Sequence, residues 1–298
     1  MLQILHMQRV TVSLIFCCLL SSTLIAQLPA VDIYYAHISM SASGMQLTGL
    51  TNITQRVGYD NQPSFSSDGN TILYTSIRDE KQADIYRYHI DSKLTEQLTN
   101  TVESEYSPLL TADEKSFTTV RVEKDSTQRL WQIRIKDGKA KLYVEGVDSV
   151  GYYWPVNENI IPCFMVTDTP SLMLVNKKAN GGRTIAHNIG RCIKVLPGTY
   201  QITYLTKDSE QTFTIRAYNY ITREFSVITE VPSISEDYVW TSDKKLLMPR
   251  GNAIWVYDAE NPSAGWVKGC DIPTLTGKNI YRMALSQDGK SLAFVADE

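Results

Sequence analysis

The stretches "VDIYYAHI" (31–38) and "ADIYRYHI" (83–90) decide the fold, because the chain contains nearly the same strand twice. Asp, Ile, Tyr, His and Ile occupy the same offsets in both stretches. Aromatic and β-branched residues of this kind suit a pleated, half-buried surface. The first copy stands close to the beginning of the 298-residue chain, without the strands that precede the second copy. The sequence therefore predicts an all-β repeat protein whose first repeat is incomplete.

A second recurring pattern is a strand, a polar turn and another strand. The clear copies are "PSFSSDGNTILYTS" (63–76), "PLLTADEKSFTTVR" (108–121), "VWTSDKKLLMPR" (239–250) and "MALSQDGKSLAFVA" (283–296). Asp68 and Asp113 are 45 residues apart, as are Asp243 and Asp288, and the wider interval leaves room for two further copies. "YWPVNENIIPCFMV" (153–166) and "IKVLPGTYQITYLT" (193–206) fit there, with Asn-Glu-Asn and Pro-Gly as turn formers.

Each copy continues with a third and a fourth predicted strand, and four strands per 40 to 45 residues indicate a propeller blade. We expect a six-bladed β-propeller of four-stranded antiparallel blades. The last copy supplies two strands and 31–52 supplies the other two, so pairing of the N- and C-terminal strands should close the ring. The expected blades are 61–100, 105–145, 150–188, 191–230, 235–272, and 280–298 completed by 31–52, all within a single domain, 27–298.

The turn and third-strand motifs resemble those of the TolB-like six-bladed β-propellers. The matching residues are "SSDG" (66–69) and "SQDG" (286–289), with "DIY" at 32–34 and 84–86. TolB carries an α/β domain before its propeller, and we expect none here. The resemblance implies an exported bacterial propeller, and it does not fix the function, because relatives of this type also occur as the propeller half of peptidases or fused to peptidoglycan-binding domains.

Residues 1–26 are predicted to be a signal peptide, with Arg9 before an apolar run that ends at Ala26. We therefore expect a periplasmic or secreted protein without membrane insertion after cleavage; retention as an N-terminal membrane anchor is the alternative. The net charge is −3 and the basic residues form no run, which argues against a nucleic-acid partner. Of the cysteines left after cleavage, Cys163 and Cys192 could pair only if neighbouring strands bring them together.

Catalytic motifs are absent from the sequence: no G-x-S-x-G, H-E-x-x-H, P-loop or dinucleotide fingerprint occurs. No catalytic residue, metal ligand or cofactor is predicted. Instead, Tyr and charged residues recur just before each innermost strand, where they should form a rim at the channel mouth suited to binding. Their alternative role is to wedge between blades. The predicted rim consists of Tyr59, Asp60, Glu105, Tyr106, Tyr152, Tyr153, Asp237, Tyr238, Tyr281 and Arg282.

Three functions remain open from the sequence. The favoured hypothesis is an exported, monomeric, non-catalytic module that binds an envelope or secreted protein, a peptide or a cell-envelope component at the channel mouth. The alternative is a metal-assisted hydrolase or lyase in the central channel. Its candidate ligands would be Asp60, Asn61, Glu105, Asn157, Glu236 and Asp237. A third possibility is a structural subunit that binds through a blade edge.

Overall fold

The computed structural model describes residues 29–41, 44–78, 82–231 and 235–298, which form strands joined by tight turns. These residues form 24 strands and contain no α-helix. Three short 3-10 helices lie in connections, at Lys177–Ala179, Pro262–Ala264 and Pro273–Leu275. The prediction of an all-β chain is confirmed. The predicted signal peptide, 1–26, lies outside the described residues.

Four sheets have four antiparallel strands each, and in each sheet the strands follow one another in chain order. The first comprises β7 (Ser104–Leu110), β8 (Ser116–Val122), β9 (Gln128–Arg134) and β10 (Ala140–Leu142). The second comprises β11 (Val150–Tyr153), β12 (Ile160–Met165), β13 (Ser171–Asn176) and β14 (Gly181–His187). The third comprises β15 (Ile189–Val195), β16 (Gln201–Lys207), β17 (Phe213–Asn219) and β18 (Phe225–Glu230). The fourth comprises β19 (Val239–Trp240), β20 (Lys245–Arg250), β21 (Ala253–Asp258) and β22 (Trp266–Asp271).

The remaining eight strands form one sheet that contains both ends of the described chain. Its strands are β1 (Val31–Ser41), β2 (Gly44–Asn52), β3 (Tyr59–Phe65), β4 (Thr71–Ile77), β5 (Ala83–His89), β6 (Thr95–Gln97), β23 (Ile280–Leu285) and β24 (Ser291–Asp297). β1 pairs antiparallel with β24 from Val31↔Asp297 to His37↔Ser291, and β2 pairs with the other edge of β1. A single parallel bridge, Val31↔Tyr59, connects this group to β3. The repeated "DIY" strands at β1 and β5 thus each lie third in a group of four.

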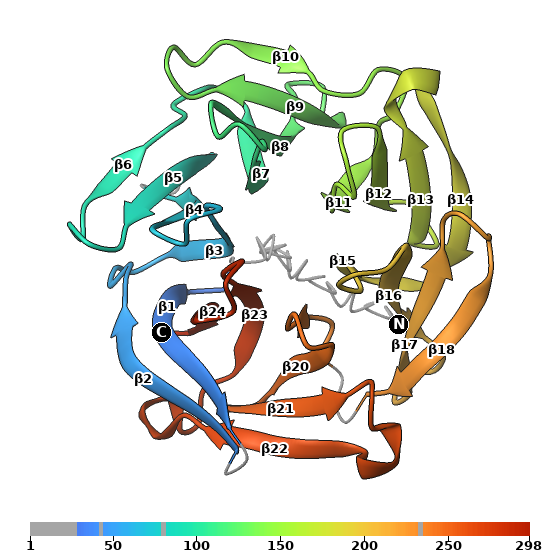
Figure 1. The fold of residues 1–298 in the computed structure, drawn as a ribbon. Coiled ribbons are helices and arrows are strands. Elements are labelled where there is room, and N and C mark those ends of the chain that lie inside the picture. Colours follow the sequence, from blue (N-terminus) through green and yellow to red (C-terminus); the bar gives the residue numbers. More distant parts are fainter. Residues whose placement is uncertain (1–28, 42–43, 79–81, 232–234) are drawn as a thin grey trace, which may run out of the picture.

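The sheets surround a common centre, with the first strand of each group innermost and the fourth outermost (Figure 1). Apolar clusters fill the spaces between adjacent sheets. One cluster joins Leu73 and Ile85 of β4 and β5 to Phe117 and Ile133 of β8 and β9. Because both faces of each sheet carry apolar residues, no group of four strands could bury its surface alone.

The recurring aspartates hold the turns between the first and second strands. The Ser66 hydroxyl donates to Asp68 Oδ1 at 2.6 Å, and the same carboxylate accepts the amide of Asn70. Thr111, Thr241 and Ser286 donate in the same way to the aspartates two residues later. The repeat that was visible in the sequence is therefore a capped turn, in which the carboxylate replaces missing backbone partners.

Candidate functional site

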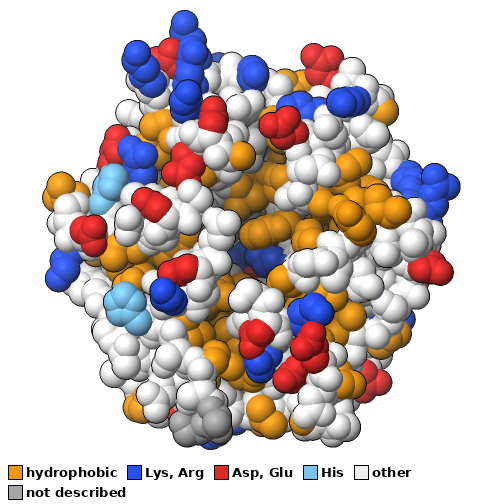
Figure 2. All heavy atoms as spheres, viewed as in Figure 1, with side chains coloured by type: hydrophobic (Ala, Val, Ile, Leu, Met, Phe, Trp, Pro, Cys, Tyr) orange, Lys and Arg blue, Asp and Glu red, His pale blue; other side chains and the backbone are white. Residues whose placement is uncertain are grey.

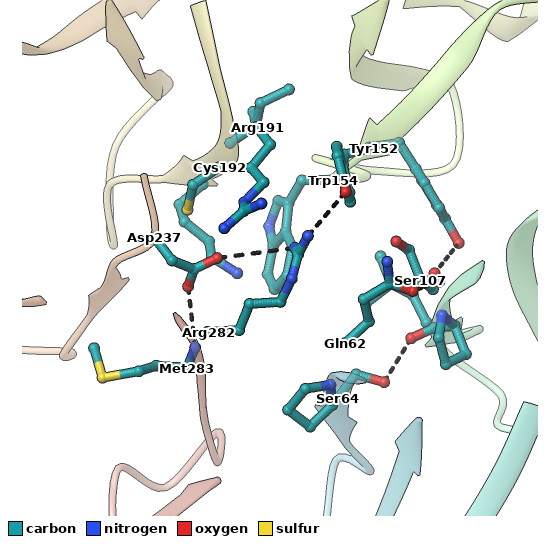
Figure 3. Close-up of a pocket in the computed structure, with 16 residues that line it drawn as sticks. Gln62, Ser64, Ser107, Tyr152, Trp154, Arg191, Cys192, Asp237, Arg282 and Met283 are labelled. Atoms are coloured by element: carbon teal, nitrogen blue, oxygen red, sulfur yellow. Dashed lines mark hydrogen bonds and ion pairs between the residues drawn. The ribbon is translucent and has the colours of Figure 1, made fainter. Parts of the chain in front are cut away.

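The innermost strands enclose a cavity of about 80 Å³ at the centre of the molecule (Figure 3). We call it the inner cavity. Its walls come from β3, β7, β11, β15 and β23 and from Asp237, just before β19. The side chains that line it include Gln62, Tyr152, Arg191 and Arg282. It therefore combines residues from distant parts of the chain.

A larger cavity of about 430 Å³ adjoins the inner cavity, and we call it the mouth. The two share Pro63, Ser64, Leu109, Trp154 and Lys194, so together they form one funnel. The mouth lies at the ends of the innermost strands, beside the turns that lead into the second strands. Figure 2 shows apolar side chains around a central opening, with a basic side chain at its bottom.

Aromatic side chains in the mouth are held by neighbouring polar groups. Trp240 is buried, and its indole N–H donates to Thr203 Oγ1 at 3.0 Å. Lys194 Nζ lies 3.8 Å from the centre of the Trp154 ring. Lys194 is the single charged residue among those that line the mouth. The mouth can thus offer rigid apolar contact area and little negative charge.

Arg282 in the inner cavity is held on two sides. Its Nη2 donates to the Tyr152 hydroxyl at 2.9 Å, and its Nη1 lies 4.0 Å from Asp237 Oδ2. Asp237 Oδ1 accepts the backbone amide of Met283 at 3.0 Å. Burial by itself would lower the pKa of Arg282, but Tyr152 and Asp237 outweigh it and raise the pKa. The Arg282 guanidinium is therefore a permanent charge in the inner cavity, which forms the floor of the funnel.

Arg191 reaches the same cavity from β15 without a matching carboxylate. Its Nε is buried and has no hydrogen-bond partner in the described parts of the chain. Glu236 accepts the backbone amide of Arg191 at 3.1 Å, but its carboxylate forms its ion pair with Lys207 at 2.6 Å. In Figure 3 the Arg191 side chain extends toward Asp237 and Arg282. The floor therefore carries two guanidinium groups and one carboxylate.

The predicted rim residues are divided by the structure. Four of the ten line the inner cavity: Tyr152, Tyr153, Asp237 and Arg282. None of the ten lines the mouth, which opens at the opposite end of the innermost strands from the predicted rim. Ligand binding by the residues at the strand starts stays a prediction.

Two of the predicted acidic residues are enclosed in ion pairs. Asp60 is fully buried and pairs with Arg56 Nη1 at 2.9 Å, and burial raises the pKa of Asp60. Glu105 is also fully buried; its Oε1 accepts from Thr101 Oγ1 at 2.7 Å and lies 3.1 Å from Arg121 Nε. Burial raises the pKa of Glu105 to about 7. Neither carboxylate is exposed to a ligand in solution.

Tyr153, Tyr238 and Tyr281 form hydrogen bonds within the fold. The Tyr153 hydroxyl donates to Thr118 Oγ1 at 2.7 Å, and the Tyr238 hydroxyl donates to Thr203 Oγ1 at 3.1 Å, both in buried positions. Tyr281 donates to Asp297 at 2.6 Å. Tyr59 and Tyr106 are half-buried, and burial raises the pKa of Tyr59 to about 12, so its phenol remains protonated.

The sequence analysis missed Phe65, Trp154, Arg191, Lys194 and Trp240 as candidate site residues. Trp154 directly follows Tyr153 and Trp240 stands two residues after Tyr238, so an aromatic residue just beyond the predicted rim tyrosines was a usable signal. Arg191 stands in a weak copy of the repeat, and no local motif distinguishes it. Cys163 and Cys192 are free thiols, so the pairing left open by the sequence does not occur.

The candidate metal ligands do not converge. No group of three or more His, Cys, Asp or Glu side chains within 29–41, 44–78, 82–231 and 235–298 is arranged to hold a metal ion. Asn157 caps a turn by accepting hydrogen bonds from the amides of Asn159 and Ile160.

In the same described ranges, no helix is long and apolar enough to cross a membrane.

Solved structures share this architecture at low sequence identity. A TolB protein from Agrobacterium tumefaciens matches with a TM-score of 0.66 at 12% identity, covering 89% of this chain and 98% of that one. A gluconolactonase from Xanthomonas campestris matches with a TM-score of 0.63 at 10% identity, covering 90% and 96%. An oligogalacturonate lyase in complex with manganese matches with a TM-score of 0.55 at 12% identity, covering 85% and 82%.

The fold is a β-propeller, similar to that of TolB and of the two enzymes. The sequence itself matches no protein-family model and no curated protein. The three similar structures include a TolB protein and two enzymes, so the shared scaffold does not select between binding and catalysis. The function must therefore be argued from the funnel.

Proposed function

We propose that this protein is an exported, non-catalytic binding module that holds a protein or peptide segment, or a cell-envelope component, in the funnel. The observation that carries the proposal is the mouth of about 430 Å³, with aromatic walls and a basic floor. Rigid aromatic side chains around a concave opening supply contact area with little loss of side-chain entropy. The floor supplies charged donors that can orient a bound group.

The proposal includes a complete ring of six four-stranded blades in a monomer, within the single domain 27–298. The four separate sheets supply four blades, and β3 to β6 supply a fifth. The group β23-β24-β1-β2 would be the sixth, closed by the pairing of β1 with β24. A closed ring would fix the innermost strands relative to one another and keep the funnel formed without a ligand.

Binding is favoured over metal-assisted hydrolysis or lysis by the way the acidic residues are used. Asp60 is paired with Arg56, Glu105 with Arg121 and Glu236 with Lys207. A catalytic metal site instead needs several oxygen or nitrogen ligands converging on one point. If Mn²⁺ or Ca²⁺ raises the thermal midpoint of the purified protein by several degrees, the result favours the metal-assisted enzyme over the binding module.

Export is proposed from residues 1–26 alone. The cleaved protein would begin at Gln27, two residues before the described chain. N-terminal sequencing of the protein recovered from a periplasmic or culture-medium fraction tests this. A mature chain that still begins at Met1 or Met7 would favour the membrane-anchored alternative.

Photo-crosslinking in intact cells tests the face that binds. A benzophenone amino acid replaces Leu285 in the mouth, and Val227 on β18, an exposed outer-strand residue, serves as the control position. A binding module that uses the funnel yields an adduct at Leu285 that weakens in a Trp154→Ala background and is missing at Val227. An adduct at Val227 alone would instead support a structural subunit that binds through a blade edge.

A further inference from the structure

The floor of the funnel has an excess of positive charge in a confined space. Arg191 and Arg282 both line the inner cavity, whereas Asp237 is the single carboxylate among the residues that line it. Asp237 is already engaged, because its Oδ1 accepts the Met283 amide and its Oδ2 faces Arg282. Arg191 forms no ion pair of its own in the described residues; its acidic neighbour Glu236 is paired with Lys207, although the Arg191 charge also helps to lower the pKa of Glu236.

Placing a guanidinium in a partly buried position without an ion-pair partner costs free energy, and an anionic ligand can offset that cost. Burial removes hydrogen bonds between the guanidinium and water, and a bound carboxylate can replace them with two parallel hydrogen bonds. Arg191 has a buried Nε that lacks a protein acceptor in the part of the chain that the structure describes. Arg282 and the Tyr152 hydroxyl, joined by a hydrogen bond of 2.9 Å, line the same cavity. These donors come from three different sheets, so the ring itself positions them.

The size and lining of the funnel narrow the chemistry. The inner cavity of about 80 Å³ is much smaller than the mouth, so its size suits a small group such as a carboxylate. The mouth beyond it is lined by Phe65, Trp154 and Trp240 together with five serines and Gln287, and no carboxylate lines it. Its aromatic side chains offer contact area to apolar peptide side chains, and its hydroxyl and amide groups can hydrogen-bond a peptide backbone.

We infer that the funnel binds the C-terminal end of a peptide or protein, with the terminal carboxylate between Arg191 and Arg282 and the last apolar side chains in the mouth. This inference rests on the proposed binding function and specifies its ligand. The narrow floor would accept only a chain end, because a continuing chain would have to pass between the two guanidinium groups.

Paired peptides test the inference. The probes are N-acetylated pentapeptides that end in Leu, Ile, Phe or Trp, each made as the free acid and as the C-terminal amide. For the peptides without Trp, binding is followed by the change in intrinsic tryptophan fluorescence, to which Trp154 and Trp240 contribute, and for all of them by calorimetry. The free acids are expected to bind at least about tenfold more tightly than the amides, since a hydrogen-bonded charge pair contributes about 1.5–3 kcal/mol.

Two variants distinguish the contribution of the funnel floor to peptide affinity from that of the outer surface. Arg191→Gln is expected to reduce affinity for the free acids by about tenfold and to leave amide binding unchanged. Its thermal midpoint should equal or exceed that of the wild type, because the replaced guanidinium has no protein carboxylate as partner. Arg223→Gln, at an exposed position on the outer surface, should change neither affinity.

The outcomes distinguish the inference from the proposed function. Acids and amides that bind equally, with binding lost in Trp154→Ala, would overturn the terminal-carboxylate assignment and retain the funnel as a binding site. A uronic-acid oligosaccharide that binds where all peptides fail would overturn the peptide assignment in the same way. If no probe binds to the wild-type protein and crosslinks at Leu285 are also missing, both the inference and the proposed function fall.

Discussion

Glu105→Gln should remove a large part of the pH dependence of stability. Glu105 is fully buried, and desolvation raises its pKa from 4.5 to about 7 in the folded protein. Thr101 and Arg121 oppose this shift, while Asp84 adds to it. Glu103 also faces Arg121, at 3.5 Å. Because the folded state holds the proton more tightly than the unfolded state, stability falls as pH rises through this window.

The magnitude follows from the two pKa values. Below pH 4.5 both states are protonated, and above pH 7 both are ionised, with the buried carboxylate unfavourable. One pKa unit corresponds to about 1.4 kcal/mol, so Glu105 should lower the free energy of unfolding by about 2.5 kcal/mol between pH 5 and pH 8. Gln keeps the shape of the side chain and cannot ionise, so the variant should lose this decrease.

Urea unfolding at pH 5, 6, 7 and 8 measures the effect as a difference between wild type and variant, which cancels the titration of other groups. Glu145→Gln, at an exposed position in the same sheet region, is the matched control and should follow the wild type. If Glu105→Gln shows the same decrease between pH 5 and pH 8 as the wild type, proton binding at Glu105 is not coupled to folding and the reasoning is wrong.

Three further changes test the packing and the closure. Tyr153→Phe removes a buried hydroxyl and should lower the free energy of unfolding in urea by about 1 kcal/mol. Gly146→Ala should destabilise by about 1 kcal/mol more than Gly138→Ala, measured by thermal unfolding. Both glycines have positive φ, but only at Gly146 would the new Cβ lie 2.9 Å from a backbone oxygen. Deleting 284–298 removes β24 and should abolish cooperative thermal unfolding; a truncated chain that melts like the wild type would contradict ring closure.

The strand pattern was predictable from the sequence because it depends on local chemistry. The hydroxyl–Asp turn appears in the sequence as Ser or Thr two residues before Asp, and the structure shows the corresponding hydrogen bond at Asp68 and at Asp288. The turns at Asn157 and Pro197 lack this hydroxyl–Asp pair, but Asn and Pro-Gly are common turn residues and could also be recognised in the sequence. The pairing of β1 with β24 followed from counting the strands that each end of the chain lacks.

The position of the funnel was not predictable in the same way. The recurrence of Tyr and acidic residues before the innermost strands indicated a rim there, but recurrence also results from repeated packing. Tyr153 and Tyr238 are examples, because each donates to a threonine on the neighbouring strands. The shape of the funnel depends on side chains contributed by six distant segments, and no single segment contains that information.

Burial and charge pairing separate the structural polar residues from the functional candidates. Asp60 and Glu105 are prominent in the sequence, and in the structure each forms an ion pair with a nearby arginine, while one oxygen of each carboxylate has no hydrogen-bond partner in the described residues. Arg191 is not prominent in the sequence, yet its guanidinium lies in the inner cavity without a carboxylate partner in the described residues. Since a fold gains nothing from a buried charge that it leaves unpaired, an unpaired arginine in a cavity is better explained by a ligand than by stability. Arg191 lies just before 193–206, one of the two copies that depart from the clear repeat pattern, so no motif in the sequence marks it.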